Sequence, residues 1–111
     1  MSATLQTTVQ NDVAQKISCL WKLVGNTPMV AVRCTLDGVP HTVYAKLEYF
    51  NFTGSIKDRM ALHVMQRGYE TGTLQASDRI CEATSGNTGI AFTAIGRALG
   101  HDTHIYMPHW L

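Results

Sequence analysis

The chain has 111 residues, of which 45% are hydrophobic and 15% charged, and its formal net charge is +1. This composition indicates a globular chain rather than a disordered one, and the length fits one small domain or part of a larger one. A net charge so close to zero gives no electrostatic case for nucleic acid or an anionic membrane as a partner. No apolar run of about 18 residues is present, so no membrane-spanning helix is predicted.

Residues 1–12 are mostly polar and lack the charged and apolar regions of a signal peptide. We interpret them as a polar lead-in to a folded part, residues 13–111. Without a signal peptide, the cysteines are expected to be reduced thiols of a cytoplasmic protein. The spacing of Cys19, Cys34 and Cys81 matches neither a zinc site nor a redox pair, and the histidines form no ligand pattern, so no metal is expected. Cys81 lies in an apolar, strand-like run and is expected to be a small buried hydrophobic residue.

The first predicted elements are a helix and a hairpin. Apolar residues recur at helical spacing before the stop at Gly25: Val13, Ile17, Leu20 and Val24. Strand-like runs follow at 28–34 and 42–48. The sequence "LDGVPH" between these runs contains an Asp-Gly turn signal, so the two strands are predicted to pair as a hairpin.

The second half of the chain alternates helix and strand. A helix is predicted from Lys57 to a stop at Gly72, a strand at 79–83, a helix closed by Gly100, and a strand "THIYMP". The last helix has apolar or small residues on almost every side, which indicates burial on several sides. This order predicts an α/β fold of βαβ units on a parallel sheet. Such a sheet needs cover on both faces, so we expect the N-terminal part of a larger fold, incomplete at its C-terminus.

Two loops in this arrangement could carry chemistry. "YFNFTGSI" (49–56) leads into the helix at Lys57, and "TSGNTG" (84–89) leads into the next helix. Binding sites in parallel sheets gather at the carboxyl ends of the strands. Neighbouring parallel strands would therefore bring both loops to one edge, which is the candidate site.

The "TSGNTG" loop has the features of an anion-binding loop. Its glycines allow close approach, and the helix start behind it offers free N–H groups and a positive dipole end. The side chains of Thr84, Ser85, Asn87 and Thr88 add further donors. The alternative is an ordinary helix cap, because these are preferred capping residue types.

Lys57 sits where a helix begins, a position that disfavours a cation. A lysine in such a place is suited to forming a Schiff base with a carbonyl. The alternative is a solvated lysine in a first helical turn. Asp58 and Arg59 are expected to offset charge or to fix the helix rather than to transfer protons.

Three ordered segments together resemble a known family: "VGNTPMV", "YAKLEYFNFTGSIKDRMA" and "EATSGNTGIAFTAIGRALG" with "IYMP". They are similar to the β-family (fold type II) of pyridoxal-phosphate enzymes, in the branch of cysteine synthase and cystathionine β-synthase. The similarity runs from about residue 23 to residue 108. "SIKDR" combined with "TSGNTG" looks like cysteine synthase more than like threonine synthases or dehydratases.

The resemblance implies a role for each motif residue. Lys57 would be the Schiff-base lysine for pyridoxal phosphate and would remove the α-proton of the substrate. Asn87 would bind the cofactor's 3′-oxygen. The carboxylate of a small amino-acid substrate would lie on the loop formed by Thr84, Ser85, Gly86 and Thr88. The reaction would be β-replacement on O-acetylserine or serine in cysteine biosynthesis, a transferase or lyase activity, and the resemblance also implies a homodimer.

The sequence departs from the family pattern in several places. Phe52 and Ala83 stand where the family usually has proline, and Phe52 removes a fixed φ from the lysine loop. Family chains continue with a glycine- and threonine-rich loop for the cofactor phosphate and a serine or threonine facing the pyridine nitrogen. Neither appears among these 111 residues, so an N-terminal fragment, inactive alone, is expected.

Two other functions stay open on the sequence. One is a non-catalytic interaction protein that pairs with a full-length homologue or another partner through an open sheet edge. The other is a small anion-binding module that uses only the "TSGNTG" helix start.

Overall fold

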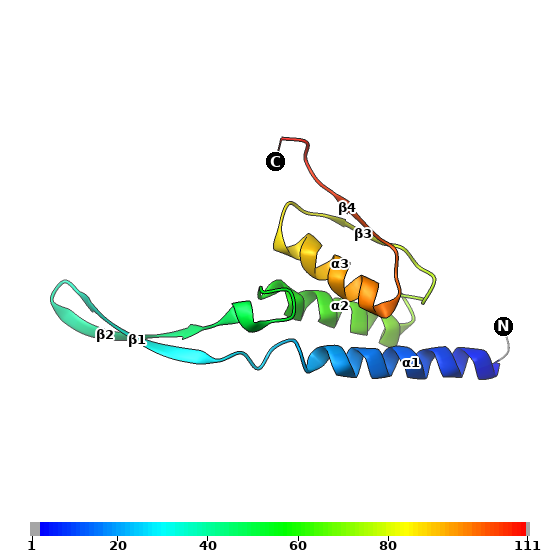
Figure 1. The fold of residues 1–111 in the computed structure, drawn as a ribbon, viewed down its shortest axis with the longest axis horizontal. Coiled ribbons are helices and arrows are strands. Elements are labelled where there is room, and N and C mark those ends of the chain that lie inside the picture. The colour runs from blue at the N-terminus through cyan, green and yellow to red at the C-terminus, as the bar shows by residue number, and fades with distance from the viewer. Residues whose placement is uncertain (1–2, 111) are drawn as a thin grey trace.

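The computed structural model describes residues 3–110, and its elements are arranged as a helical body with a long projecting hairpin (Figure 1). In chain order they are α1 (Ala3–Trp21), β1 (Met29–Leu36), β2 (Val39–Lys46), the 3-10 turn η1 (Glu48–Phe50), α2 (Lys57–Thr71), β3 (Ile80–Ala83), α3 (Asn87–Leu99) and β4 (Thr103–Tyr106). The projecting hairpin makes the molecule elongated, with principal extents of 69 × 36 × 19 Å. No helix within residues 3–110 is long and apolar enough to cross a membrane.

The strands form two separate sheets. β1 and β2 pair antiparallel, as the sequence predicts, and β3 and β4 pair parallel. The expectation that the strand before Lys57 lies beside the strand before the "TSGNTG" loop is therefore wrong. β2 returns along its hairpin partner, and its open edge pairs with no other strand among the described residues. The only βαβ unit in this part of the chain is β3–α3–β4.

The hairpin is specified by its turn and by apolar residues at every second position of its strands. Asp37 and Gly38 have φ values of 50° and 79°, the positive pair of a tight two-residue hairpin turn. Alternate residues place apolar side chains on one face, and five of them are exposed: Val30, Val32, Leu36, Val39 and Val43. No helix of the described chain packs against the hairpin.

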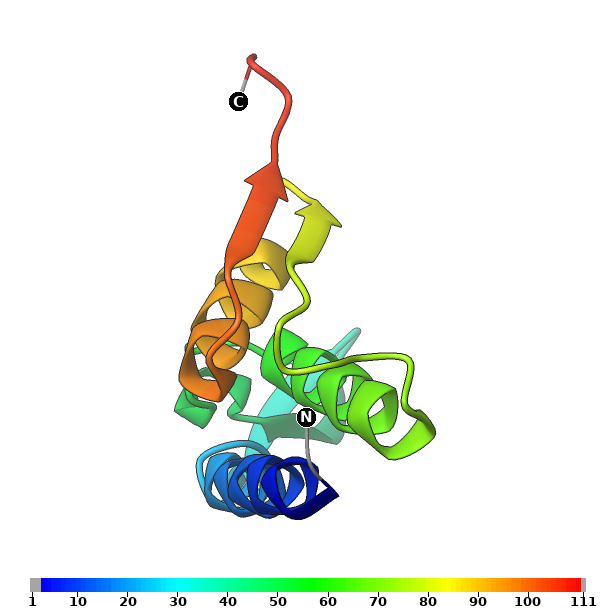
Figure 2. The ribbon, with the colours of Figure 1, turned by 90° about the vertical axis from the view of Figure 1, so that its right-hand side faces the viewer.

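The core lies where the helices meet. α3 packs against α2, against both strands of the parallel sheet and against α1, so its predicted burial on several sides is confirmed (Figure 2). The buried apolar side chains come from α1 and the turn after it, and from α2 and α3: Val13, Ile17, Leu20, Val24, Ala61, Leu62, Met65, Ala91, Phe92, Ile95 and Leu99. Both predicted helix stops are also confirmed, because Gly72 and Gly100 end α2 and α3 with φ of 74° and 95°.

The parallel sheet is covered on one face by α3 and exposed on the other. Side chains alternate along β3, so that Ile80 and Glu82 are partly covered while Cys81 and Ala83 are exposed. The expectation that Cys81 is buried is therefore wrong. Its apolar neighbours in sequence belong to a strand that has only one face covered.

α1 extends well beyond its amphipathic part. Residues 3–12, interpreted as a lead-in, are helical in the structure, and the helix ends at Trp21 rather than at Gly25. No proline or glycine interrupts residues 3–21, so backbone hydrogen bonding continues through the polar stretch. The chain then turns, with Lys22 N–H donating to Cys19 O at 3.1 Å, before Val24 is buried.

α2 and α3 run side by side in the same direction (Figures 1 and 2). Their C-terminal ends are joined through His101, which is 1% exposed. The ring nitrogen Nε2 lies 2.5 Å from the hydroxyl of Tyr69, and Nδ1 lies 2.7 Å from the carbonyl oxygen of Asp78. Because the two helices point the same way, their N-termini, each preceded by one of the candidate loops, lie at the same end of the pair.

Candidate functional site

Lys57 is the first residue of α2, and its side chain is exposed. The loop before it turns at Gly54, whose φ of 90° lies in the left-handed region that favours glycine. The Lys57 backbone N–H donates to the Ser55 hydroxyl at 3.2 Å. The ammonium group makes no hydrogen bond or ion pair with any residue of 3–110, so the amine is available for chemistry.

Asp58, the next residue, is buried and accepts hydrogen bonds from the loop before the helix. Its side chain is 0% exposed, although the sequence offers it as a first-turn acid. Oδ2 accepts the backbone N–H of Thr53 at 2.6 Å, and Oδ1 accepts the Thr53 hydroxyl. The carboxylate therefore joins the first turn of α2 to the middle of the loop, and the expectation that Asp58 fixes the helix is confirmed.

Arg59 is held by a carboxylate from outside its helix. Its Nε and Nη2 donate to the two oxygens of Glu48 at 2.9 and 3.0 Å, a bidentate pair. Oε1 of Glu48 also accepts the Thr27 hydroxyl at 2.6 Å, and Oε2 accepts Nδ2 of Asn51 at 2.8 Å. These hydrogen bonds, first those from Arg59, lower the pKa of Glu48 from 4.5 to about 2.

The same network reaches the base of the hairpin. The buried Asn51 amide accepts the Gly25 N–H at 2.8 Å and donates to the Glu48 carbonyl oxygen at 2.7 Å. Lys46 donates to the Thr27 carbonyl oxygen. The "GNTP" segment, the η1 turn and the start of α2 are thus joined through polar groups, and the prediction that Arg59 fixes the helix is confirmed.

The "TSGNTG" loop has few internal bonds by contrast. α3 begins at Asn87 without a side-chain cap, which contradicts the ordinary-cap alternative. The hydroxyl of Thr84 accepts the Gly86 N–H at 3.4 Å. The side chains of Ser85, Asn87 and Thr88 make no hydrogen bond with any residue that the structure describes. Their donors, together with the backbone N–H groups of Asn87 and Thr88, are free for a ligand.

Two glycines in this loop differ in their surroundings. A Cβ on Gly89 would lie 2.7 Å from Cγ2 of Thr84 and 3.2 Å from Cγ2 of Ile105, so the helix start packs closely on the strands. A Cβ on Gly86 would meet nothing within 4 Å. The loop is therefore closely packed against the strands at Gly89 and has open space at Gly86.

The structure brings the sequence-predicted residues to one end of the α2–α3 pair, for a different reason than expected. The parallel course of the two helices does this, and not neighbouring strands. No hydrogen bond or ion pair within residues 3–110 joins Lys57 to residues 84–88. Sequence reasoning assigned no role to Thr27, Glu48 or Asn51. All three lie inside the first two family motifs, and this position in the motifs could have indicated that they matter.

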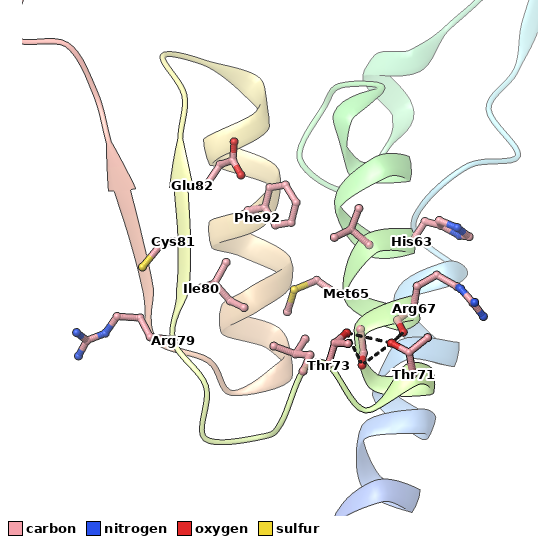
Figure 3. A pocket seen from close by; sticks show the side chains of 13 residues that line it. His63, Met65, Arg67, Thr71, Thr73, Arg79, Ile80, Cys81, Glu82 and Phe92 are labelled. Atoms are coloured by element: carbon pink, nitrogen blue, oxygen red, sulfur yellow. Dashed lines mark hydrogen bonds between the residues drawn. The ribbon is translucent and has the colours of Figure 1, made fainter.

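A separate groove of about 520 Å³ runs between α2 and β3 (Figure 3). Its lining includes the apolar side chains of Met65, Ile80 and Phe92, which Figure 3 shows between the helices and β3, and His63 and Arg67 of α2. Neither Lys57 nor any residue of the "TSGNTG" loop lines it. No group of three or more histidine, cysteine, aspartate or glutamate side chains in the described chain is placed to hold a metal ion.

Comparison with known proteins assigns the family. The family described as pyridoxal-phosphate dependent enzyme matches residues 20–111. The chain belongs to that family. Its membership confirms the resemblance seen in the motifs and implies pyridoxal phosphate as the family's cofactor.

The related proteins also confirm the cysteine synthase branch. A cysteine synthase of Aquifex aeolicus is 46% identical over 90 residues, which are 78% of this chain and 28% of the relative. The solved structure of a hydrogen sulfide-producing enzyme from Fusobacterium nucleatum matches with a TM-score of 0.84 and 46% identity, over 88% of this chain and 29% of that one. An O-acetyl serine sulfhydrylase from Entamoeba histolytica matches with a TM-score of 0.72 and 32% identity, over 83% and 29%. The chain thus spans under a third of the length of these relatives.

Proposed function

We propose that this chain carries the lysine and the substrate-carboxylate loop of a cysteine synthase-like enzyme. Lys57 binds pyridoxal phosphate covalently, and Asn87 binds the cofactor's 3′-oxygen. Thr84, Ser85, Gly86 and Thr88 hold the carboxylate of the amino-acid substrate. One observation carries the proposal: the free amine of Lys57 and the free donors of residues 84–88 lie at the same end of the α2–α3 pair.

The residues present fit this cofactor and substrate. A covalent cofactor needs an amine without a competing partner, and Lys57 offers one on a backbone fixed by Asp58 and Arg59. An anionic carboxylate needs unpaired donors at a helix start, and α3 provides them with open space above Gly86. Pyridoxal phosphate, when bound, supplies an electron sink next to the substrate's α-carbon.

The reaction we propose is β-replacement on O-acetylserine or serine, as in cysteine biosynthesis. The Lys57 amine, released once the substrate's amino group has taken its place on the cofactor, would take the proton from the substrate's α-carbon, and the donors of residues 84–88 would keep the carboxylate in place during this transfer. We further propose that the working form is a cytoplasmic homodimer. Residues 3–110 contain no segment that we assign to the cofactor's phosphate, so we propose that these 111 residues do not complete the reaction alone.

The test is absorbance of the purified chain after addition of pyridoxal phosphate. We expect a Schiff-base band in the unmodified chain that Lys57→Ala removes. Lys22→Ala, a change of another exposed lysine, is the matched control and should leave the band intact. A band that persists in Lys57→Ala would refute the assignment. Binding of an anion such as acetate without any band would favour the simple anion-binding module.

A second function is supported by the uncovered surfaces. The apolar face of the hairpin and the outer face of the β3–β4 sheet are both exposed. Surfaces of this kind mark contacts with another chain. A non-catalytic role, in which the chain pairs with a full-length homologue, would bury them. Size-exclusion chromatography of the chain mixed with such a cysteine synthase distinguishes the two functions, because only the second requires a stable complex without cofactor binding.

A further inference from the structure

We propose that Glu48 is a positioning residue for Lys57, which it serves by fixing the chain on both sides of the lysine. This inference rests on the proposed function of Lys57. It adds a residue that contacts neither cofactor nor substrate in that proposal and acts only through Arg59 and Asn51.

The Glu48 carboxylate is fully occupied by partners from three segments. Oε1 accepts Thr27 Oγ1 at 2.6 Å and Arg59 Nη2 at 3.0 Å, and Oε2 accepts Asn51 Nδ2 at 2.8 Å and Arg59 Nε at 2.9 Å. A carboxylate has about four acceptor positions, so none remains for a proton transfer or a substrate. Its side chain is only 19% exposed. Glu48 therefore holds neighbours in place and does not act on a ligand.

The partners flank the lysine closely. Arg59 lies two residues after Lys57, on the helical turn from which the lysine projects, and a bidentate guanidinium pair fixes direction as well as distance. Asn51 lies six residues before it, and its carbonyl oxygen accepts the Gly54 N–H at 3.0 Å within the lysine loop. Loss of the Glu48 charge would weaken a contact on each flank at once, although Asn51 keeps its bonds to the Glu48 carbonyl oxygen and to the Gly25 N–H.

Glu70 on the same helix provides the comparison. Its carboxylate also accepts an arginine, Arg67 at 2.6 Å, and an amide, Gln66 at 2.7 Å. Both partners lie within one turn of the same helix, so Glu70 holds no distant segment. Glu70→Gln is therefore a control for Glu48→Gln: the same substitution with the same kinds of partner, placed on the helix that carries Lys57.

The test measures how selectively the chain is labelled by pyridoxal phosphate. The mixture is reduced with borohydride, and peptide mass spectrometry gives the ratio of label at Lys57 to label at Lys22. We expect Glu48→Gln to lower this ratio about tenfold, because charged hydrogen bonds to both flanks are lost. Glu70→Gln should leave it unchanged. Glu48→Asp, which keeps the charge, should recover part of it, a rescue that a merely space-filling role would not give.

Each result of the labelling experiment either supports or overturns the role of Glu48. An unchanged ratio in Glu48→Gln, with clear Lys57 selectivity in the unmodified chain, overturns the role of Glu48 and leaves the proposed function intact. Equal labelling of Lys57 and Lys22 in the unmodified chain overturns the proposed function and the role of Glu48 with it. If circular dichroism shows that Glu48→Gln is unfolded, Thr27→Val decides instead. It removes one bond to the carboxylate and also the acceptor of Arg59 Nη2 at 3.2 Å, so it should lower the ratio about threefold, and no decrease refutes the proposal.

Discussion

The loops before α2 and α3 lead into helices that start at the same end of the α2–α3 pair, yet they are built in opposite ways. The loop before α2 is held by two carboxylates, Asp58 and Glu48, which accept its backbone and side-chain donors. The side chains of Ser85, Asn87 and Thr88 make no hydrogen bond within residues 3–110. The first loop fixes the backbone of its reactive lysine before any ligand arrives, and the second keeps its donors free for one.

The largest expected effect comes from removing the buried carboxylate of the first loop. Asp58→Ala deletes two acceptors and leaves the Thr53 N–H without a partner. We expect a loss of about 3 kcal/mol in the free energy of unfolding, measured with urea. Asp12→Ala, which breaks only an exposed pair with Lys16, should cost less than about 0.5 kcal/mol. Similar losses for the two variants would contradict the comparison.

The second loop should be sensitive to packing rather than to lost hydrogen bonds. Gly89→Ala places a methyl group 2.7 Å from Cγ2 of Thr84, a stiff β-branched side chain, and should cost about 2 kcal/mol in the free energy of unfolding. Gly86→Ala, which meets no atom within 4 Å, is the control.

A double variant sharpens this measurement. Thr84→Ser removes the Cγ2 atom that the new methyl would meet, so Gly89→Ala should cost less in that background. Additive effects of the two changes would show that the contact with Thr84 is not the cause.

Acid should act on the first loop through Glu48. Its pKa is 4.5 when unpaired and about 2 in the folded chain, so the folded chain binds this proton more weakly. The stabilisation from Glu48 is therefore complete above pH 4.5 and is lost as the pH falls from 4.5 through about 2. Arg59 stays charged throughout, and Lys46 is the other cation nearby, on the Thr27 carbonyl.

The measurement is the unfolding free energy at pH 6 and at pH 3. Glu70 and Asp102 also have lowered pKa values, from hydrogen bonds to Gln66 and His104 respectively, so the total acid dependence is not due to Glu48 alone. Glu48→Gln should weaken the pH dependence, and an identical dependence in both chains would contradict the assignment.

The smallest effect on stability is expected in the donors of the second loop. Ser85→Ala and Asn87→Ala remove side chains that have no hydrogen bond within the described chain, and each should change the free energy of unfolding by less than about 0.5 kcal/mol. Asn87→Ala should nevertheless weaken the absorbance band with pyridoxal phosphate. A large loss of stability would mean that this loop is as firmly held as the first.

Local signals predicted most of the elements. The Asp37-Gly38 turn, the glycine stops at residues 72 and 100, and the helix start at Lys57 each depend on a few adjacent residues, and the structure confirms them. The pairing of strands could not be read in the same way, because it depends on which edges meet in space. The prediction that Cys81 is buried was wrong because an apolar run does not reveal that one face of its strand is uncovered.

The site shows the same division. The sequence alone predicted a reactive lysine at Lys57 and an anion-binding loop from Asn87 and the small polar residues around Gly86. The role of Glu48 requires partners 21 residues before it and 11 residues after it to come together, and no local pattern reports such a meeting. Side-chain networks between distant segments are visible only once the chain is folded.

The hairpin has a consequence for how the molecule moves. Its strands share no sheet with β3 and β4, and no helix packs on them, so among the described residues it is joined to the helical body mainly through the polar groups at its base. A two-stranded ribbon of this kind has little stability of its own. It should open and close as an independent cooperative unit, with amides that exchange hydrogen for deuterium long before those of α3. The lysine loop therefore lies at the border between a fast-exchanging and a slow-exchanging half of the chain.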